Sequence, residues 1–315
     1  MNKLRIVFMG TPEFAAGILD TIIKHHFNVV GVITAADKPA GRGQKLKYSA
    51  VKEYALAHDL KILQPTSLKD PDFLSELKSL NANLQVVVAF RMLPEAVWRM
   101  PSLGTFNLHA SLLPDYRGAA PINWAIINGD KKTGVTTFFI DDKIDTGEMI
   151  LRREINIDEN ENAGSLHDRL MELGSTAVVD TLKLIESDAV KTEIQKDIPG
   201  IRPAPKLTKD NCRINWNAPA VEIFNQIRGL SPYPAAWTII RDGDAELNIK
   251  IYDAEIHMED HEWNPGKILC DKRRIRVACA DGFINLRELQ FPGKKKMTVG
   301  ELLNGLTLAD AAIAL

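Results

Sequence analysis

The stretch over residues 106–126, FNLHASLLPDYRGAAPINWAI, ends an apolar run with two residue types that serve in catalysis. Asn107 and His109 are two positions apart, so on a strand both side chains point to one face. An amide and an imidazole side by side can donate hydrogen bonds to one oxygen atom on which negative charge develops during a reaction. A histidine on its own is more often structural, so a catalytic assignment depends on its neighbours.

An acidic loop supplies a candidate neighbour. The segment IDDKIDTG, residues 140–147, carries the carboxylates of Asp141, Asp142 and Asp145 before a Thr-Gly turn signal. Such a loop is usually a solvated turn, but one aspartate here can hydrogen-bond the imidazole and stabilise its charge. We therefore predict a site in which amide, imidazole and carboxylate stabilise an oxyanion. A metal site is not expected, because no zinc-ligand spacing is present.

Strands and helices that alternate along the first half of the chain must position these residues. β-branched apolar runs predict strands, and apolar residues at three- and four-residue spacing predict helices between them. The predicted strands are residues 4–9, 28–34, 84–90 and 104–109, and the predicted helices are residues 13–26, 49–58 and 70–80. This alternation predicts an α/β fold with a doubly wound, mostly parallel, Rossmann-like sheet. Ligands of such sheets bind beyond the carboxyl ends of the strands, where Asn107 and His109 lie.

The second half of the chain changes character after a long predicted helix at residues 163–187. Over residues 198–210, prolines and a glycine interrupt the regular spacing of apolar residues that helices and strands show, as in a linker. A helix at residues 219–229 and short strand-like runs follow, and they predict a small OB-like β-barrel. We expect a catalytic domain over residues 1–189, a linker over 190–208 and the barrel over 209–315.

Bulk properties exclude several classes of protein. A chain of 315 residues with 45% hydrophobic content and a formal charge of -2 is globular and is not a uniformly basic nucleic-acid coat. Its three cysteines suggest neither a disulfide framework nor a zinc site. No signal peptide and no membrane-spanning run are evident, so a cytoplasmic protein is expected. The segment FMGTPEF, residues 8–14, has one glycine where the dinucleotide-binding fingerprint needs three, which disfavours NAD.

Two segments together resemble a known signature. NLHASLLPDYRGAAPI, followed about twenty residues later by DDKIDTG, resembles the folate-dependent formyltransferases. FMGTPEF, ADKPAGRGQKLKYSAVK and the two-domain length are similar to the members of that family that act on methionyl-tRNA. The resemblance covers essentially the whole chain and is weaker in the barrel.

The resemblance implies transfer of the formyl group of 10-formyltetrahydrofolate to the α-amino group of methionine on initiator tRNA, for translation initiation. It implies that Asn107, His109 and Asp145 are the catalytic trio. Asn107 and His109 would stabilise the tetrahedral oxyanion, and Asp145 would hold His109 and an ordered water that moves the amine proton. No covalent enzyme intermediate and no metal are required.

The resemblance also implies a folate pocket at three strand ends. Its expected residues are Phe90, Arg91, Met92, Leu93, Ser111, Leu112, Leu113, Pro114, Ile140 and Asp142. Backbone groups there would bind the polar edge of the pterin, and apolar side chains would cover its faces. Family members usually have a tyrosine-glycine pair where this chain has Phe90 and Arg91, a departure that resembles the glycinamide ribonucleotide formyltransferases.

Basic clusters suggest where tRNA would bind. A charge run is normally a solvated face, and the resemblance implies that the glycine-containing insertion at residues 37–47 contacts the acceptor end. Two clusters in the barrel suit phosphate contacts. The expected tRNA-binding residues are Arg42, Lys45, Lys47, Arg273, Arg274, Lys294, Lys295 and Lys296. A monomer is the simplest expectation for the oligomeric state.

Three alternatives stay open at this point. The same trio would serve formyl transfer to another amine, such as glycinamide ribonucleotide or an amino-sugar nucleotide, although neither needs the barrel or the basic insertion. A hydrolase that releases formate is a second possibility. A non-catalytic tRNA-binding module is the third, but it would not need Asn107, His109 and Asp145 together.

Overall fold

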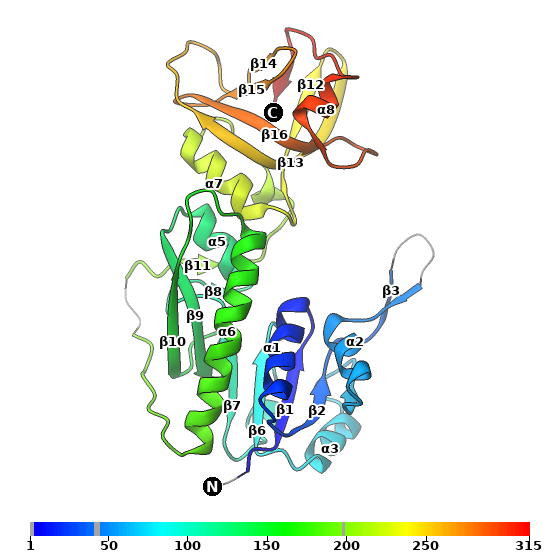
Figure 1. Ribbon diagram of the computed structural model, residues 1–315, viewed down its shortest axis with the longest axis vertical. Coiled ribbons are helices and arrows are strands. Elements are labelled where there is room, and N and C mark those ends of the chain that lie inside the picture. Colours follow the sequence, from blue (N-terminus) through cyan, green and yellow to red (C-terminus); the bar gives the residue numbers. More distant parts are fainter. Residues whose placement is uncertain (1–2, 41–44, 197–198) are drawn as a thin grey trace. The chain divides into compact units, whose positions relative to one another are not determined.

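The computed structural model describes residues 3–40, 45–196 and 199–315, and for residues 38–40, 45 and 46 it describes the backbone alone. The chain divides into two compact units that are interleaved along the sequence (Figure 1). Unit 1 comprises residues 1–121, 133–155 and 167–203, and unit 2 comprises residues 122–132, 156–166 and 204–315. The boundary expected at residues 190–208 therefore stays a prediction, since the units are not consecutive segments.

A seven-stranded sheet forms the centre of unit 1, with the order β10-β9-β7-β6-β1-β2-β5. Its strands are β1 (Ile6–Gly10), β2 (Val29–Ile33), β5 (Ile62–Leu63), β6 (Leu84–Val88), β7 (Thr105–His109), β9 (Lys132–Phe139) and β10 (Met149–Asn156). The pairs β5-β2, β2-β1, β1-β6 and β6-β7 are parallel, whereas β7 and β9 are antiparallel. The predicted doubly wound, mostly parallel sheet is confirmed.

Helices cover both faces of this sheet. The helices that begin or lie in unit 1 are α1 (Glu13–Lys24), α2 (Ala50–Ala57), α3 (Pro71–Ser79), α4 (Glu95–Trp98), α5 (Pro121–Ile127) and α6 (Ala163–Glu186). Phe73 and Leu77 of α3 pack with Val7, Met9 and Val87 on one face. On the other face α6 approaches β7 and α1, because a Cβ added at Gly174 would contact side chains of both. The helices therefore shield both faces of the sheet from water, as expected for strands whose residues are nearly all apolar.

The order of the strands reverses between β1 and β6, and Gly10 lies at that point. The chain runs from β1 to β2 and β5 on one side, and then returns to β6 and β7 on the other. A Cβ at Gly10 would lie 2.5 Å from Cβ of Ala15 and 2.9 Å from the carbonyl oxygen of Val88. The single glycine of FMGTPEF thus permits the close approach of β1, α1 and the carboxyl end of β6.

A second, antiparallel sheet dominates unit 2, with the order β14-β15-β16-β13-β12-β18. Its elements are the 3-10 helix Asp210–Cys212, α7 (Ala220–Leu230), β12 (Ala236–Asp242), β13 (Ala245–His257), β14 (Ile268–Cys270), β15 (Ile275–Ala278), β16 (Phe283–Gln290), β17 (Met297–Thr298), α8 (Val299–Leu303) and β18 (Ile313–Ala314). A bridge between Lys267 and Ile313 joins the two ends of the sheet. The sheet is therefore a nearly closed barrel, and the predicted OB-like barrel is confirmed.

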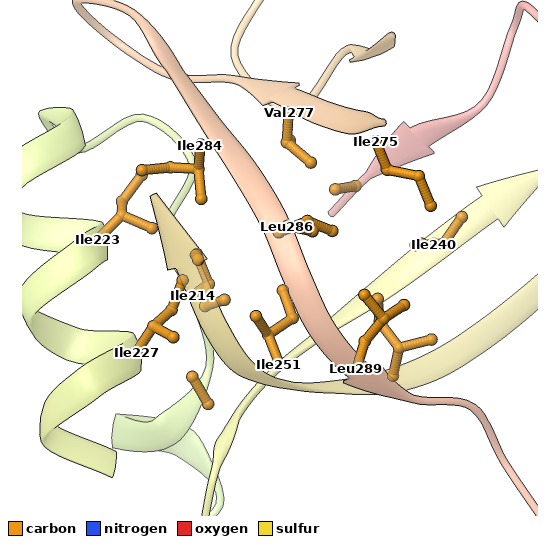
Figure 2. Packing of buried hydrophobic residues seen from close by; sticks show 14 of the residues in the cluster. Ile214, Ile223, Ile227, Ile240, Ile251, Ile275, Val277, Ile284, Leu286 and Leu289 are labelled. Atoms are coloured by element: carbon orange, nitrogen blue, oxygen red, sulfur yellow. The ribbon is translucent and has the colours of Figure 1, made fainter. Parts of the chain in front are cut away.

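Apolar residues from all sides of the barrel and from α7 form one core (Figure 2). Ile251 of β13 is fully buried among them. Replacing Ile251 with alanine is expected to lower the free energy of unfolding by about 2–5 kcal/mol, because a cavity adds to the lost transfer free energy. Urea unfolding followed by circular dichroism measures this loss. The exposed Val221→Ala in α7 is the matched control, and equal losses in the two variants would contradict this account of the core.

Two short ribbons complete the fold. β3 (Lys38–Ala40) and β4 (Lys45–Lys47) form an antiparallel hairpin within the basic insertion, which extends away from α2 (Figure 1). β8 (Arg117–Gly118) pairs with β11 (Pro203–Ala204). Sequence patterns predicted neither ribbon, since each strand is only two or three residues long.

Candidate active site

Asn107 and His109 lie at the carboxyl end of β7, as their spacing predicted. They point to the face of the sheet that α3 and α4 cover, since Thr105 on the same face donates a hydrogen bond to the carbonyl of Trp98. Asn107 is half-buried, and within the described ranges its amide has no hydrogen-bond partner. A half-buried amide with unused donors is suited to bind a ligand oxygen.

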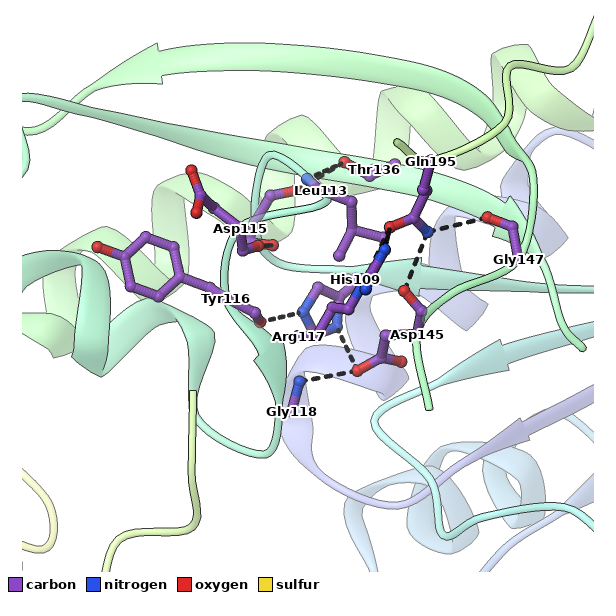
Figure 3. A network of polar contacts seen from close by, with 11 residues as sticks. His109, Leu113, Asp115, Tyr116, Arg117, Gly118, Thr136, Asp145, Gly147 and Gln195 are labelled. Carbon is purple, nitrogen blue, oxygen red and sulfur yellow. Dashed lines mark hydrogen bonds and ion pairs between the residues drawn. The ribbon is translucent and has the colours of Figure 1, made fainter. Parts of the chain in front are cut away.

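Groups of the protein lie next to both ring nitrogens of His109. The side chain is 7% exposed, and its Nε2 lies 2.8 Å from the carbonyl oxygen of Tyr116. A carbonyl oxygen only accepts, so Nε2 carries the proton of this hydrogen bond. Nδ1 lies 3.8 Å from Oδ2 of Asp145, beyond hydrogen-bond distance but close enough for charge attraction (Figure 3). Nδ1 is therefore the ring nitrogen left for a third group.

Asp145 is oriented by the backbone. The N–H of Gly118 donates to Oδ2 of Asp145 at 2.9 Å, and the carboxylate is mostly buried (Figure 3). Two residues later the chain passes so close to β9 that a Cβ at Gly147 would lie 1.6 Å from the carbonyl oxygen of Phe139. Only glycine fits there, which explains the Thr-Gly signal and fixes the loop that presents Asp145.

Left-handed backbone conformations gather around these side chains. The φ angles of Ala89, Tyr116 and Asp145 are +47°, +63° and +55°. Each such residue other than glycine costs on the order of 1–3 kcal/mol, and such strain clusters at functional sites. One of the three follows β6, one carries the carbonyl that holds His109, and one is the candidate acid itself.

The turn after His109 is fixed by hydrogen bonds from its own residues and from β9. Ser111 is fully buried, and its hydroxyl donates to the carbonyl of Asp115. Thr136 donates its hydroxyl proton to the carbonyl of Ser111 and accepts from the N–H of Leu113 (Figure 3). The bond between Leu113 and Pro114 is cis. The side chains of Ser111 and Leu113 thus support the turn, and its backbone borders the site.

Apolar side chains from the predicted pocket come together at Ile140. Leu93 is buried in the cluster that α3 and α4 form with the sheet, and Phe90 and Ile140 pack against that cluster. Ile140 also packs against a second cluster, which contains Leu113 and Phe138. Residues from the ends of β6 and β9 and from the turn after β7 therefore belong to two apolar clusters that Ile140 joins.

Other predicted pocket residues face away from the core. Met92 is 67% exposed, Asp142 is exposed and Leu112 and Pro114 are half-buried. Arg91 is exposed, and its guanidinium donates to the carbonyl of Thr66 at 3.0 Å. This hydrogen bond ties the loop after β6 to the loop before α3.

The predicted tRNA-binding residues of unit 1 lie on or next to the β3-β4 hairpin. Arg42 lies outside the described residues, Lys45 pairs through its backbone with Ala40, and Lys47 is exposed. The base of the hairpin is anchored, because Lys52 forms an ion pair with Asp37. The hydrogen bonds from Lys52 and then Gln64 hold the pKa of Asp37 below its usual range.

The predicted tRNA-binding residues of the barrel are all exposed; they are Arg273, Arg274, Lys294, Lys295 and Lys296. Arg274 forms an ion pair with Asp271, and Lys296 forms one with Glu288. The N–H of Arg273, then that of Arg274, lowers the pKa of Asp271. These clusters are therefore partly neutralised by acids of the same unit.

Sequence patterns missed several groups of the site. The carbonyl of Tyr116, the N–H of Gly118 and the side chain of Gln195 all hold the candidate trio or its loop. The arginine-glycine pair in DYRGAAP was the only local signal for this turn. Nothing in the sequence around Gln195 indicates its contacts.

Two further kinds of feature are absent from the part of the chain that the structure describes. Over these ranges, no group of three or more histidine, cysteine, aspartate or glutamate side chains is arranged to hold a metal ion. Among the same residues, no helix is long and apolar enough to cross a membrane.

Comparison with known proteins gives consistent matches over both units. The formyl transferase family model matches residues 4–182, and the model of the formyl transferase C-terminal domain matches residues 206–307. A methionyl-tRNA formyltransferase of Flavobacterium johnsoniae is 68% identical over 99% of both chains. One of Bacteroides fragilis is 52% identical, covering 98% of this chain and 97% of its own.

Solved structures share the fold at lower identity. A sugar 3N-formyl transferase, WlaRD, was crystallised with dTDP and 5-N-formyl-THF and matches 94% of this chain and all of its own, with a TM-score of 0.66 and 23% identity. HypX from Aquifex aeolicus in complex with tetrahydrofolic acid has a TM-score of 0.64 and 17% identity, over 98% of this chain and 49% of its own. At these identities the likeness concerns the fold alone.

Proposed function

The chain belongs to the formyltransferase family, and we propose that it transfers the formyl group of 10-formyltetrahydrofolate to the α-amino group of methionyl initiator tRNA. The observation that carries the proposal is the 68% identity to a methionyl-tRNA formyltransferase over 99% of both chains. The product is N-formylmethionyl-tRNA, the substrate of translation initiation. The relatives align over nearly their whole length, so the similarity that supports the proposal covers both matched domains.

The reaction is an acyl transfer between two nitrogen atoms. The uncharged α-amine of methionine attacks the formyl carbon, and the carbonyl π electrons move to oxygen to give a tetrahedral oxyanion. Collapse of this intermediate breaks the bond to N10 of the folate. The amine loses one proton and N10 gains one, so tetrahydrofolate leaves and no covalent enzyme intermediate is formed.

The candidate trio divides this work. Asn107 donates its unused amide N–H to the oxyanion, and His109 donates through Nδ1, since Nε2 is bonded to Tyr116. Asp145, 3.8 Å from Nδ1, stabilises positive charge on the ring while the proton passes from amine to N10. The trio can act in this way because Tyr116 and Gly118 fix His109 and Asp145 before substrate arrives.

The folate is proposed to bind along the strand ends that meet at Ile140. Phe90, Leu93 and Leu113 lie in or against the same apolar clusters and would support the faces of the pterin. The backbone of the half-buried Leu112 and Pro114 and that of the exposed Arg91 and Met92 would bind its polar edge. Asp142 and Met92 are exposed at the rim, where they would meet the outer part of the folate.

The tRNA is proposed to contact the basic insertion and the exposed basic residues of the barrel. Replacing Arg42, Lys45 and Lys47 together with alanine is expected to lower kcat/KM for tRNA and to flatten its salt dependence. The slope of log kcat/KM against log salt should fall by about 0.7–0.9 for each phosphate that the variant no longer neutralises. Steady-state rates over a series of salt concentrations measure the slope.

A matched control removes the same number of charges elsewhere. Lys24, Lys61 and Lys78 are exposed in unit 1 and lie near the amino ends of the strands, away from Asn107 and His109. Their replacement with alanine should leave the slope unchanged. An unchanged slope in the insertion variant as well would refute the role of the insertion.

The rival acceptors are an amino-sugar nucleotide and glycinamide ribonucleotide. The solved structures that share the fold include a sugar formyltransferase and a phosphoribosylglycinamide formyltransferase, at identities that carry no substrate assignment. Incubation with 10-formyltetrahydrofolate and charged tRNA, followed by hydrolysis and chromatography, should yield N-formylmethionine from initiator tRNA. Absence of this product from active, folded enzyme would overturn the proposal.

A further inference from the structure

Gln195 lies in the segment that follows α6, in the stretch predicted as a linker. Its side chain is 7% exposed, whereas that of its neighbour Ile194 is 72% exposed. The segment is joined to the start of β10, because Glu193 and Met149 exchange two backbone hydrogen bonds at 2.8 Å. A polar side chain turned inward from a paired segment has a specific partner to reach.

The amide of Gln195 uses both of its ends. Its Nε2 donates to the carbonyl oxygens of Asp145 and Gly147, each at 2.9 Å, so it spans the loop that presents the candidate acid (Figure 3). Its Oε1 accepts from Nε and Nη2 of Arg117 at 3.1 and 2.9 Å. The side chain therefore links the Asp145 loop to β8.

β8 and the residue before it hold two members of the trio, His109 and Asp145. The carbonyl of Tyr116 accepts from His109, the guanidinium of Arg117 binds Gln195, and the N–H of Gly118 binds the carboxylate of Asp145. Three successive residues thus connect to His109, to Gln195 and to Asp145. Gln195 closes this ring of contacts on the side of the aspartate loop.

We infer that Gln195 is a positioning residue, which holds the backbone of Asp145 so that its carboxylate faces Nδ1 of His109. The inference rests on the proposed function, because it assigns a role in formyl transfer. Asp145 adopts a left-handed φ of +55°, a conformation that persists only when surrounding contacts impose it. Loss of both amide donors would leave the loop free to relax away from His109.

The first test compares two buried glutamines. Gln195→Ala is expected to lower kcat by about 10- to 100-fold, since displacing a reacting group by an ångström costs that much. The KM for tRNA and for the folate should stay within about threefold, because Gln195 is buried and its amide is already used by Arg117, Asp145 and Gly147. The control is Gln85→Ala, which removes a 1% exposed amide bonded to Thr105 at the far end of β7. An equal fall in kcat in both variants would show a general structural role and overturn the inference.

A double-mutant cycle tests whether Gln195 acts through Asp145. In a chain that already carries Asp145→Ala, adding Gln195→Ala should lower kcat by less than about threefold, because the group it positions is absent. A full 10- to 100-fold loss in that background would contradict the inference. Circular dichroism and unfolding curves of all four proteins show whether each one is folded.

A third variant separates the donors from the shape of the side chain. Gln195→Glu keeps an acceptor for Arg117 but presents an oxygen to the carbonyls of Asp145 and Gly147, so kcat should fall as far as in Gln195→Ala. Activity close to that of the unmodified chain would overturn the inference. An unmodified chain that forms no formylmethionyl-tRNA would instead refute the proposed function, so the two failures are distinguishable.

Discussion

Replacement of His109 with alanine should lower kcat for formyl transfer by about 10³-fold, because it removes an oxyanion donor together with the positive ring charge that Asp145 stabilises during proton transfer. The binding of tRNA should be nearly unchanged. His109 is 7% exposed and bonded to Tyr116, so it makes no surface for a large ligand. Single-turnover rates with saturating tRNA and folate, beside tRNA dissociation constants, measure the two effects separately.

The same domain offers a matched histidine. His167 on α6 also lies beside an aspartate, with Nδ1 2.9 Å from Asp168, but it is outside the trio. His167→Ala should retain its activity. A large loss of tRNA affinity in His109→Ala, with the chemical step intact, would make His109 an RNA contact and contradict the mechanism.

Replacement of Asn107 with aspartate should be more damaging than its replacement with alanine. Asn107→Ala removes one donor, a loss of about 10²–10³-fold in kcat. Asn107→Asp removes the donor in almost the same shape and adds a negative charge where the oxyanion develops, so the loss should exceed that of alanine. Rates measured at saturating substrates compare the two variants directly.

Asn83→Asp is the control variant for the negative charge that Asn107→Asp adds. Asn83 lies just before β6, at the end of the strands opposite to His109; its Oδ1 accepts from the N–H of Arg5 at 2.7 Å, a role that aspartate keeps, and its Nδ2 donates to the carbonyl of Lys3 at 3.2 Å, a contact that aspartate loses. This variant should keep full activity. If Asn107→Asp were as active as Asn107→Ala, the amide would not face developing negative charge, and Asn107 would have another role.

The central strands could be predicted because a strand that is buried on both faces consists almost entirely of apolar residues. β1 and β6 are buried at every position, and both are apolar runs in which only Gln85 of β6 is polar. The β8-β11 ribbon has no such apolar pattern, because only two residues pair with two others that lie more than eighty positions away in the sequence. The closure of the barrel by β18 is another long-range pairing of two residues, between β12 and Ile313–Ala314.

The site shows the same division between local and long-range information. The two-residue spacing of Asn107 and His109 predicted a shared face, because a strand alternates its side chains regardless of what packs on it. The sequence pattern alone did not decide which of the three aspartates in the loop lies beside His109. Asp141 bonds the hydroxyl of Thr146, Asp142 is exposed, and Asp145 lies beside His109. That selection follows from the tertiary contacts of Gly118 and Gln195, which no local period records.

We propose that this chain formylates methionine as the aminoacyl group of initiator tRNA. The most direct measurement is a single reaction that contains 10-formyltetrahydrofolate with equal concentrations of methionyl initiator tRNA, free methionine and glycinamide ribonucleotide. Mass spectrometry of each amine then shows where the formyl group has gone. We expect it on methionyl-tRNA, and in the His109→Ala enzyme on none of the three. Formyl transfer to free methionine or to glycinamide ribonucleotide, with none to the tRNA, would contradict the account.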